Sequence, residues 1–175
     1  AKNLLGEIDP VLFASLLYLG SGTGLLRMGR VRQPVGTVAK EARLDASDYP
    51  WLTGATLLGG VVAPISLFFG LRATGAATAS LLLNFELVAT TLIASLVFAE
   101  FIGRRAFVAI AVITGAGIVL TLNATGLPGF SLAAAGIVLA CILWGIDNNL
   151  TGKIAGKNPL AIAMVTGIGA GGVSF

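Results

Sequence analysis

Two carboxylates, Glu86 and Asp147, are the only charged side chains inside the long apolar runs of this sequence. A charge at the centre of a membrane helix costs roughly 2.5–3.5 kcal/mol on insertion scales, so it normally faces a cavity or has a partner. Glu86 lies near the middle of residues 76–99, and two interpretations stay open for it. It either lines a cavity and binds substrate or exchanges a proton, or it is protonated and ties two helices together.

The polar residues next to Glu86 divide between two helix faces. Thr90 follows Glu86 by four residues, so the two side chains share one face. Asn84 precedes Glu86 by two residues and lies on a different face, together with Ser80 and Val88. A single ligand held by Asn84 and Glu86 side by side is therefore not expected.

A second polar cluster, Asp147, Asn148 and Asn149, lies near the end of the run 129–150. An Asp at the C-terminal end of a helix opposes the helix dipole, so its position requires a reason. Trp144 shares a face with Asn148. The cluster either forms a polar gate or substrate contact, or it is an interfacial belt in which Trp144 lies at headgroup depth and Asp147 pairs with Lys or Arg. The candidates for a substrate or proton pathway are Glu86, Asn84, Thr90, Asp147, Asn148 and Trp144.

Other kinds of site find little support in the residue types. The chain has no His and one Cys, Cys141, which excludes a disulfide framework and an ordinary His/Cys metal site. No carboxylates are paired at short spacing, and no Gly-rich run has the context of a phosphate loop. We therefore expect no enzyme activity, no metal and no cofactor. The basic residues fall in loops, so the net charge of +3 does not indicate nucleic acid.

The elements that must position these residues are membrane helices. Of 175 residues, 56% are hydrophobic and 11% are charged, whereas soluble domains carry about 25% charge. Lipid cannot satisfy an open strand, so the apolar runs are expected to be helices. The predicted fold is an all-α polytopic transmembrane bundle with five complete spans and most of a sixth, because the chain stops at Phe175 inside an apolar run. The runs cover residues 10–26, 51–71, 76–99, 106–122, 129–150 and 159–175.

Helix starts, helix breaks and close helix contacts also have signals. Asp9-Pro10 and Asn158-Pro159 each combine an N-cap residue with Pro at the first helical position. Asn123–Gly129 is rich in turn residues and divides a long uncharged stretch. Gly is abundant, and small residues favour close packing of membrane helices. The Gly runs are Gly20/Gly22/Gly24, Gly59/Gly60 and Gly115/Gly117.

Basic residues gather in alternate loops. The segments 27–50, 100–105 and 151–158 hold nine of the eleven Lys and Arg residues, which predicts that these loops face the cytoplasm. Glu100 and Arg104 stand four residues apart, and we expect an ion pair at a helix end.

A faint internal repeat relates the first and last runs. Aligned without gaps, Pro10, Ala14, Gly20 and Gly22 match Pro159, Ala163, Gly169 and Gly171. Five spans separate the two copies, so the second must cross the membrane in the opposite direction. That is the pattern of the inverted repeats in many secondary transporters, although four identities in so Gly-rich a chain also fit chance.

The stretch LRATGAATASLLLNFELVATTLIASLVFAEFIGRRAFVAIAVITGAGIVL, residues 71–120, resembles the EamA-like branch of the drug/metabolite transporter superfamily. The segment LWGIDNNLTGKIAGKNP, residues 143–159, is similar to the helix that opens that family's second half. The resemblance implies a fold of ten helices in two inverted five-helix repeats. Residues 1–128 would then be most of the first repeat without its first helix, and residues 129–175 the start of the second. Many relatives have Pro where this chain has Leu87, so a Pro-induced kink is not assumed.

The predicted function is a secondary transporter that moves small metabolites or drugs across the plasma membrane by alternating access. The alternative is a structural or regulatory integral membrane subunit without transport activity. The expected partners are the lipid bilayer and a small-molecule substrate of unknown identity, with a second copy of the chain as a further candidate. The expected location is a bacterial inner membrane, crossed several times.

Overall fold

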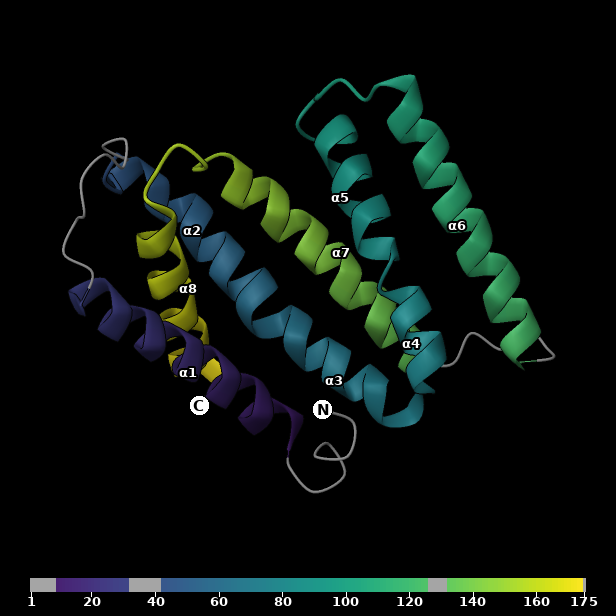
Figure 1. Cartoon of the computed structure of the whole chain (residues 1–175), viewed down its shortest axis with the longest axis horizontal. Coiled ribbons are helices and arrows are strands. Elements are labelled where there is room, and N and C mark those ends of the chain that lie inside the picture. The colour runs from purple at the N-terminus through teal and green to yellow at the C-terminus, as the bar shows by residue number, and fades with distance from the viewer. Residues whose placement is uncertain (1–8, 32–41, 126–131, 175) are drawn as a thin grey trace.

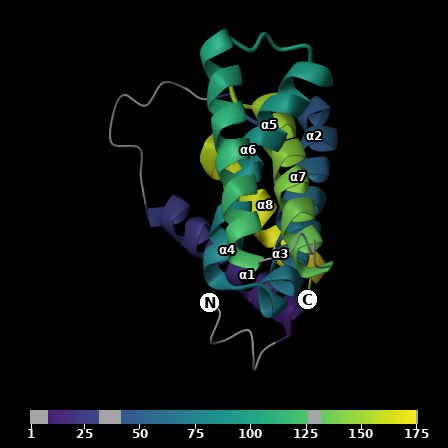
Figure 2. The same cartoon turned by 90° about the vertical axis from the view of Figure 1, so that its right-hand side faces the viewer.

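A computed structural model describes residues 9–31, 42–125 and 132–174. The elements of this part of the chain are all helices (Figure 1). Helices α5 and α6 lie on one side of the assembly, α1 and α8 on the other, and α7 and α3 between them (Figures 1 and 2). The elements in chain order are α1 (Pro10–Val31), η1 (Ala46–Asp48), α2 (Tyr49–Ala55), η2 (Thr56–Val62), α3 (Ala63–Ala73), α4 (Ala76–Leu82), α5 (Phe85–Leu96), α6 (Arg104–Thr125), α7 (Leu132–Gly152) and α8 (Pro159–Ser174).

By length and composition, four helical segments of the described chain can cross a membrane: Val11–Met28, Ala46–Ala73, Ala76–Leu96 and Leu132–Gly152. The multi-pass character predicted from the sequence is therefore confirmed. α8 covers the sixth predicted run, and with 16 residues it is shorter than these four segments. α6 covers the run 106–122, and its role as a span stays a prediction.

Both predicted helix starts are present. The Asp9 carboxylate oxygen Oδ1 accepts a hydrogen bond from the Val11 N–H at 2.8 Å, which satisfies one of the free donors at the start of α1. The Asn158 oxygen Oδ1 accepts from the Ala161 N–H at 2.9 Å and caps α8 in the same way. α6 ends at Thr125 and α7 begins at Leu132, while residues 126–129 of the predicted break Asn123–Gly129 lie outside the described residues.

The second span contains a π-helical segment that the apolar pattern does not reveal. In η2 the hydrogen bonds are one residue wider than in an α-helix, and the Ala63 N–H donates to the Leu58 carbonyl. The next hydrogen bond of this π-helical pattern would run from residue 64 to the Gly59 carbonyl. Residue 64 is Pro, which has no N–H, so this bond cannot form. The Gly59 carbonyl is thus left free to accept from other helices.

The third span is interrupted, although it contains no Pro. α4 ends at Leu82, two residues form a turn, and α5 begins at Phe85. At the turn the Asn84 N–H donates to the Leu81 carbonyl at 3.1 Å. In an unbroken α-helix it would donate to the Ser80 carbonyl instead. The Asn84 side-chain amide then donates to the Ser80 carbonyl at 3.2 Å, so a polar side chain compensates for the lost backbone bond.

Described residues of the basic segments 27–50 and 151–158 meet at one end of the bundle, near the end of the third run. The Asn158 N–H donates to the Ala42 carbonyl at 3.0 Å, and the Lys157 ammonium pairs with Asp45 at 2.7 Å and with Asp48 at 3.0 Å. The Lys153 ammonium lies 4.5 Å from the centre of the Phe98 ring. The segments after the first and fifth runs therefore lie on the same side as the end of the third run, in agreement with the alternation of basic loops.

Lys157 is held in its charged form by this cluster. Its hydrogen bonds with Asp45 and then with Asp48 raise the pKa of the Lys157 ammonium above its ordinary value of 10.5. A raised pKa means that the charged form of Lys157 is stabilised by folding. The stability that these contacts contribute is therefore present at neutral pH and is lost as the pH rises through the folded-state pKa. The contact thus fastens the start of α8 to the segment before α2 under physiological conditions.

The expected ion pair between Glu100 and Arg104 is wrong, because the helix on which it depends ends earlier. α5 ends at Leu96, and Ala99 adopts a left-handed conformation with φ of 53°. The Glu100 N–H then donates back to the Ala94 carbonyl at 3.0 Å, which closes the helix end. Glu100 is exposed in a connection, and α6 begins only at Arg104.

α1 and α8 pack against each other through small residues (Figure 1). A Cβ added at Gly22 would lie 2.6 Å from the backbone nitrogen of Ile168, and one added at Gly167 would lie 2.8 Å from the Cα of Gly22. The two backbones therefore approach as closely as glycine allows. α8 runs opposite to α1, as the inverted repeat requires, while the half-turn relation between the two helices stays a prediction.

We expect Gly22→Ala to lower the free energy of unfolding by about 1–2 kcal/mol, because the new methyl meets backbone that cannot move aside. Gly20 and Gly24 provide matched controls in the same helix, since a Cβ at either position meets nothing within 4 Å among the described residues. Their Ala variants should match or slightly exceed the wild type, because Ala favours helix. Denaturant unfolding in detergent micelles would measure all three, and equal stabilities would contradict the close contact.

Candidate functional site

The structure brings together three of the residues predicted from the sequence. The side-chain amide nitrogen of Asn148 on α7 donates to the Glu86 carboxylate at 3.1 Å and to the Thr90 hydroxyl oxygen at 3.3 Å, both on α5. Glu86 and Thr90 share one face of their helix, as their spacing predicts. Glu86 is half-buried and Asn148 is exposed, so the group combines a fixed geometry with access from outside the described bundle.

Small residues hold α5 against α7 beside this group. A Cβ added at Gly145 would lie 2.8 Å from the backbone nitrogen of Thr90, so the two helices touch through their backbones. Asn149 is buried there, and its amide donates to the Thr90 carbonyl at 3.0 Å and to the Gly145 carbonyl at 2.7 Å. The position of Asn148 opposite Glu86 thus follows from a close contact one turn away.

The interruption before α5 contributes a second attachment to α7. The turn at residues 83–84 leaves the Leu82 carbonyl without its usual helical donor, because the Glu86 N–H bonds to Leu83 instead. The buried Cys141 thiol donates to the Leu82 carbonyl across the interface, with sulfur and oxygen 3.5 Å apart. Cys141 therefore has a structural partner and lies within a buried cluster of apolar residues.

Asn84 lies outside the group. Its amide donates to the carbonyls of Ser80 and Leu81 in its own helix, and its side chain is exposed. The expectation that Asn84 and Glu86 do not hold one ligand together agrees with this arrangement.

Asp147 belongs to a different face of α7. Its carboxylate accepts a hydrogen bond from the Thr151 hydroxyl at 3.1 Å and packs directly on Gly59 of η2, where a Cβ would overlap it. Within the described part of the chain it has no ion pair with Lys or Arg, so the interfacial pairing considered for it is not found there. Its carboxylate lies instead in the space that Gly59 leaves beside the π-helical segment.

Trp144 connects α7 to the π-helical segment η2 by a hydrogen bond. Its ring nitrogen donates to the Gly59 carbonyl at 3.0 Å, and the Tyr18 hydroxyl donates to that oxygen at 3.3 Å. This is the carbonyl that Pro64 leaves without a backbone donor. Trp144 packs beside a buried apolar cluster and is half-buried, so it makes an interhelical contact, and its place in an interfacial belt stays a prediction.

Tyr18 and Pro64 were missed as contributors to the polar contacts of the bundle. A Pro inside an apolar span was a usable signal, because it removes a donor and leaves an acceptor that needs a partner. Tyr18 had no comparable signal, since a single Tyr near the middle of a predicted span gives no indication of which helix it will contact.

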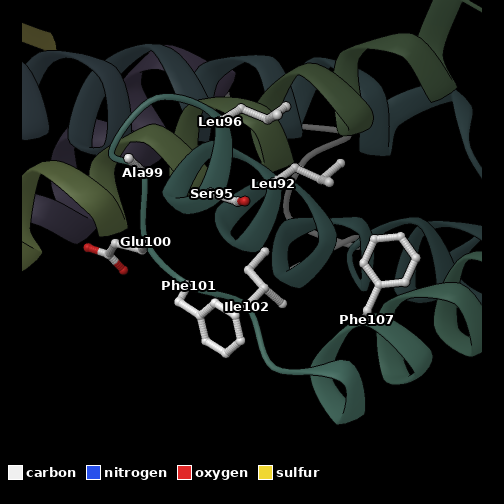
Figure 3. Close-up of a pocket in the computed structure, with 8 residues that line it drawn as sticks. All are labelled: Leu92, Ser95, Leu96, Ala99, Glu100, Phe101, Ile102 and Phe107. Carbon is white, nitrogen blue, oxygen red and sulfur yellow. The ribbon is translucent and has the colours of Figure 1, made fainter.

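An open pocket of about 500 Å³ lies elsewhere, between the end of α5 and the start of α6 (Figure 3). Its lining is mostly apolar, and the Glu100 carboxylate points away from Phe107. None of the six predicted site residues lines it. The lining residues are Leu92, Ser95, Leu96, Ala99, Glu100, Phe101, Ile102 and Phe107. The group of Glu86, Thr90 and Asn148 therefore lies outside this pocket.

The described residues contain no group of three His, Cys, Asp or Glu side chains that could hold a metal ion. What the group at Glu86 offers is a carboxylate, an amide and a hydroxyl between two apolar helices. Such a group can bind a polar solute or take up and release a proton.

Comparison with known proteins places the chain in a family. An uncharacterized transporter from Methanothermobacter thermautotrophicus strain Delta H is 29% identical over 170 residues, which cover 91% of this chain and 50% of the relative. The chain thus spans about half the length of that relative. No solved structure matches the chain at a significant level. The model of the EamA-like transporter family matches residues 1–123, and the chain therefore belongs to the EamA-like transporter family.

Proposed function

We propose that this protein is a secondary transporter that moves a small metabolite or drug across the membrane by alternating access. The observation that carries the proposal is the hydrogen-bonded group of Glu86, Thr90 and Asn148 across two apolar helices. A carboxylate in this position is costly, and transport is a function that makes use of it. The family membership supports the same conclusion.

The whole transporter is proposed to contain ten helices in two inverted five-helix repeats. Residues 1–128 would belong to the first repeat and residues 129–175 to the start of the second. The family match over residues 1–123 and the opposite crossing of α1 and α8 support this division. In this arrangement α5 and α7 come from different repeats, so the Glu86 group lies where the repeats meet, which is the common place for a substrate site in such folds.

Transport would be measured in proteoliposomes that contain the full-length protein. The vesicles are incubated with a cell extract with and without a proton gradient, and the solutes they take up are identified by mass spectrometry. Uptake of a defined small solute that exceeds the uptake by protein-free vesicles supports the proposal. Correctly folded protein that moves no solute under either condition would favour the alternative, a structural or regulatory membrane subunit.

We further propose that the protein lies in a bacterial inner membrane with its basic loops in the cytoplasm. Single Cys residues at the exposed positions Ala155 and Ala76, in a Cys141→Ser background, test this orientation. A membrane-impermeant thiol reagent added to intact cells should label the Cys at 76, and should reach the Cys at 155 only after the membrane is opened. The reverse pattern would overturn the orientation. Gln33, in the first basic loop, lies outside the described residues.

A further inference from the structure

The hydrogen-bond donors of the Glu86 group are nearly all in use. The Asn148 amide has two N–H donors, and it gives one to Glu86 and one to Thr90. The Glu86 carboxylate beside it favours this orientation, because the opposite one would set the Asn148 carbonyl oxygen against a carboxylate oxygen. A ligand that reaches the group therefore finds no free N–H on Asn148.

The acceptors of the group are free. Among the described residues, the second carboxylate oxygen of Glu86 and the carbonyl oxygen of Asn148 accept no hydrogen bond from a protein side chain or backbone. Thr90 adds one hydroxyl, which can donate or accept. The group thus presents two acceptors, one of them charged, and the ligand that complements them is itself a hydrogen-bond donor.

The charge of the surrounding helices has the same sign. The six apolar runs contain Glu86 and Asp147 and no Lys, Arg or His. Asp147 directly precedes Asn148, and it has no ion pair in the described part of the chain. Two carboxylates without a positive partner in an apolar surrounding favour a ligand that brings the positive charge.

We propose that the transported substrate is an organic cation with N–H donors, a protonated amine, that binds to Glu86 and Asn148. This inference rests on the proposed transport function and adds the chemical class of the substrate. The ammonium group donates to the free oxygens of Glu86 and Asn148, while its organic part lies against the apolar side chains of α5 and α7.

Three probes with the same four-carbon chain separate charge from hydrogen bonding. Butylammonium has the charge and three N–H donors, butyltrimethylammonium has the charge alone, and butyrate has the opposite charge. Calorimetric titration of the full-length protein in nanodiscs should show that butylammonium binds at least about 10-fold more tightly than butyltrimethylammonium. Butyrate should not bind.

Variants connect this binding to the group. Glu86→Gln should weaken butylammonium binding by roughly 10- to 100-fold, because a charge-assisted hydrogen bond becomes a neutral one. Asn148→Leu removes the second acceptor and should also weaken binding. The exposed Glu100 provides a matched control, and Glu100→Gln should bind butylammonium as the wild type does. Size-exclusion chromatography confirms that each variant is folded.

The outcomes distinguish this inference from the transport proposal. Tighter binding of butyrate, equal binding of both cations, or full binding by folded Glu86→Gln would overturn the amine inference. Uptake of only neutral or anionic solutes from the cell extract would also overturn it and leave the transport proposal standing. Selective binding of butylammonium to a protein that exchanges no solute would instead contradict transport and keep the cation site.

Discussion

Glu86→Gln is expected to lower gradient-driven transport by the full-length protein by roughly 10- to 100-fold, the factor for loss of a charge-assisted hydrogen bond. The Gln carbonyl oxygen can still accept from the Asn148 amide, so the contact between α5 and α7 is kept. The variant should therefore insert and fold normally. Its defect comes from the loss of the negative charge and of the titrating group.

Two further measurements assign the role of Glu86. Counterflow, the exchange of labelled for unlabelled substrate without a gradient, should remain in Glu86→Gln if Glu86 only carries protons, and should fall if Glu86 binds the substrate. Glu86→Ala removes the acceptor as well and should also destabilise the protein, because the Asn148 amide loses a partner. Gradient-driven transport by Glu86→Gln would be normalised to the amount of the variant in the membrane. Near-normal transport would mean that Glu86 only holds α5 and α7 together by a hydrogen bond.

Features that depend on local chemistry could be predicted from the sequence. The caps at Asp9 and Asn158 were predictable because a side-chain oxygen followed by Pro satisfies the free donors of a helix start. The shared face of Glu86 and Thr90 follows from helical spacing alone. The spans themselves follow from the apolar runs, because a helix is the structure that satisfies its backbone in lipid.

Features that depend on which helices meet could not be predicted in the same way. Apolar content does not distinguish α- from π-helix, so the π-helical segment at Thr56–Val62 appears only in the structure. Trp144 and Asp147 both contact Gly59, which lies some 85 residues earlier in the chain, and no local spacing encodes that contact.

Helix ends were the other source of error. The apolar run continues to residue 99, but the helix ends at Leu96, and Ala99 takes the left-handed conformation. Ala is an uncommon residue for that conformation, which usually selects Gly or Asn. With no Gly to mark the end, the sequence predicts a longer helix, and the expected ion pair of Glu100 and Arg104 fails with it.

The packing of α5 on α7 makes a separate prediction for Gly145→Val. A Cβ at this position would already lie 2.8 Å from the Thr90 nitrogen and 3.0 Å from Ala89, and Val adds two methyl groups to it. The helices must separate, because the atoms in contact belong to the backbone. We expect a loss of roughly 3 kcal/mol in the free energy of unfolding, at the upper end for overpacked contacts.

The same variant should also reduce transport, because separation of the helices removes the Asn148 amide from Glu86 and Thr90. Gly152→Val is the matched control on the same helix, since a Cβ there meets nothing within 4 Å among the described residues. Denaturant unfolding and uptake per folded molecule would be measured for both variants. If Gly145→Val matched Gly152→Val in stability and transport, α5 and α7 would not be held together at Gly145, and the geometry of the Glu86 group would lose its support.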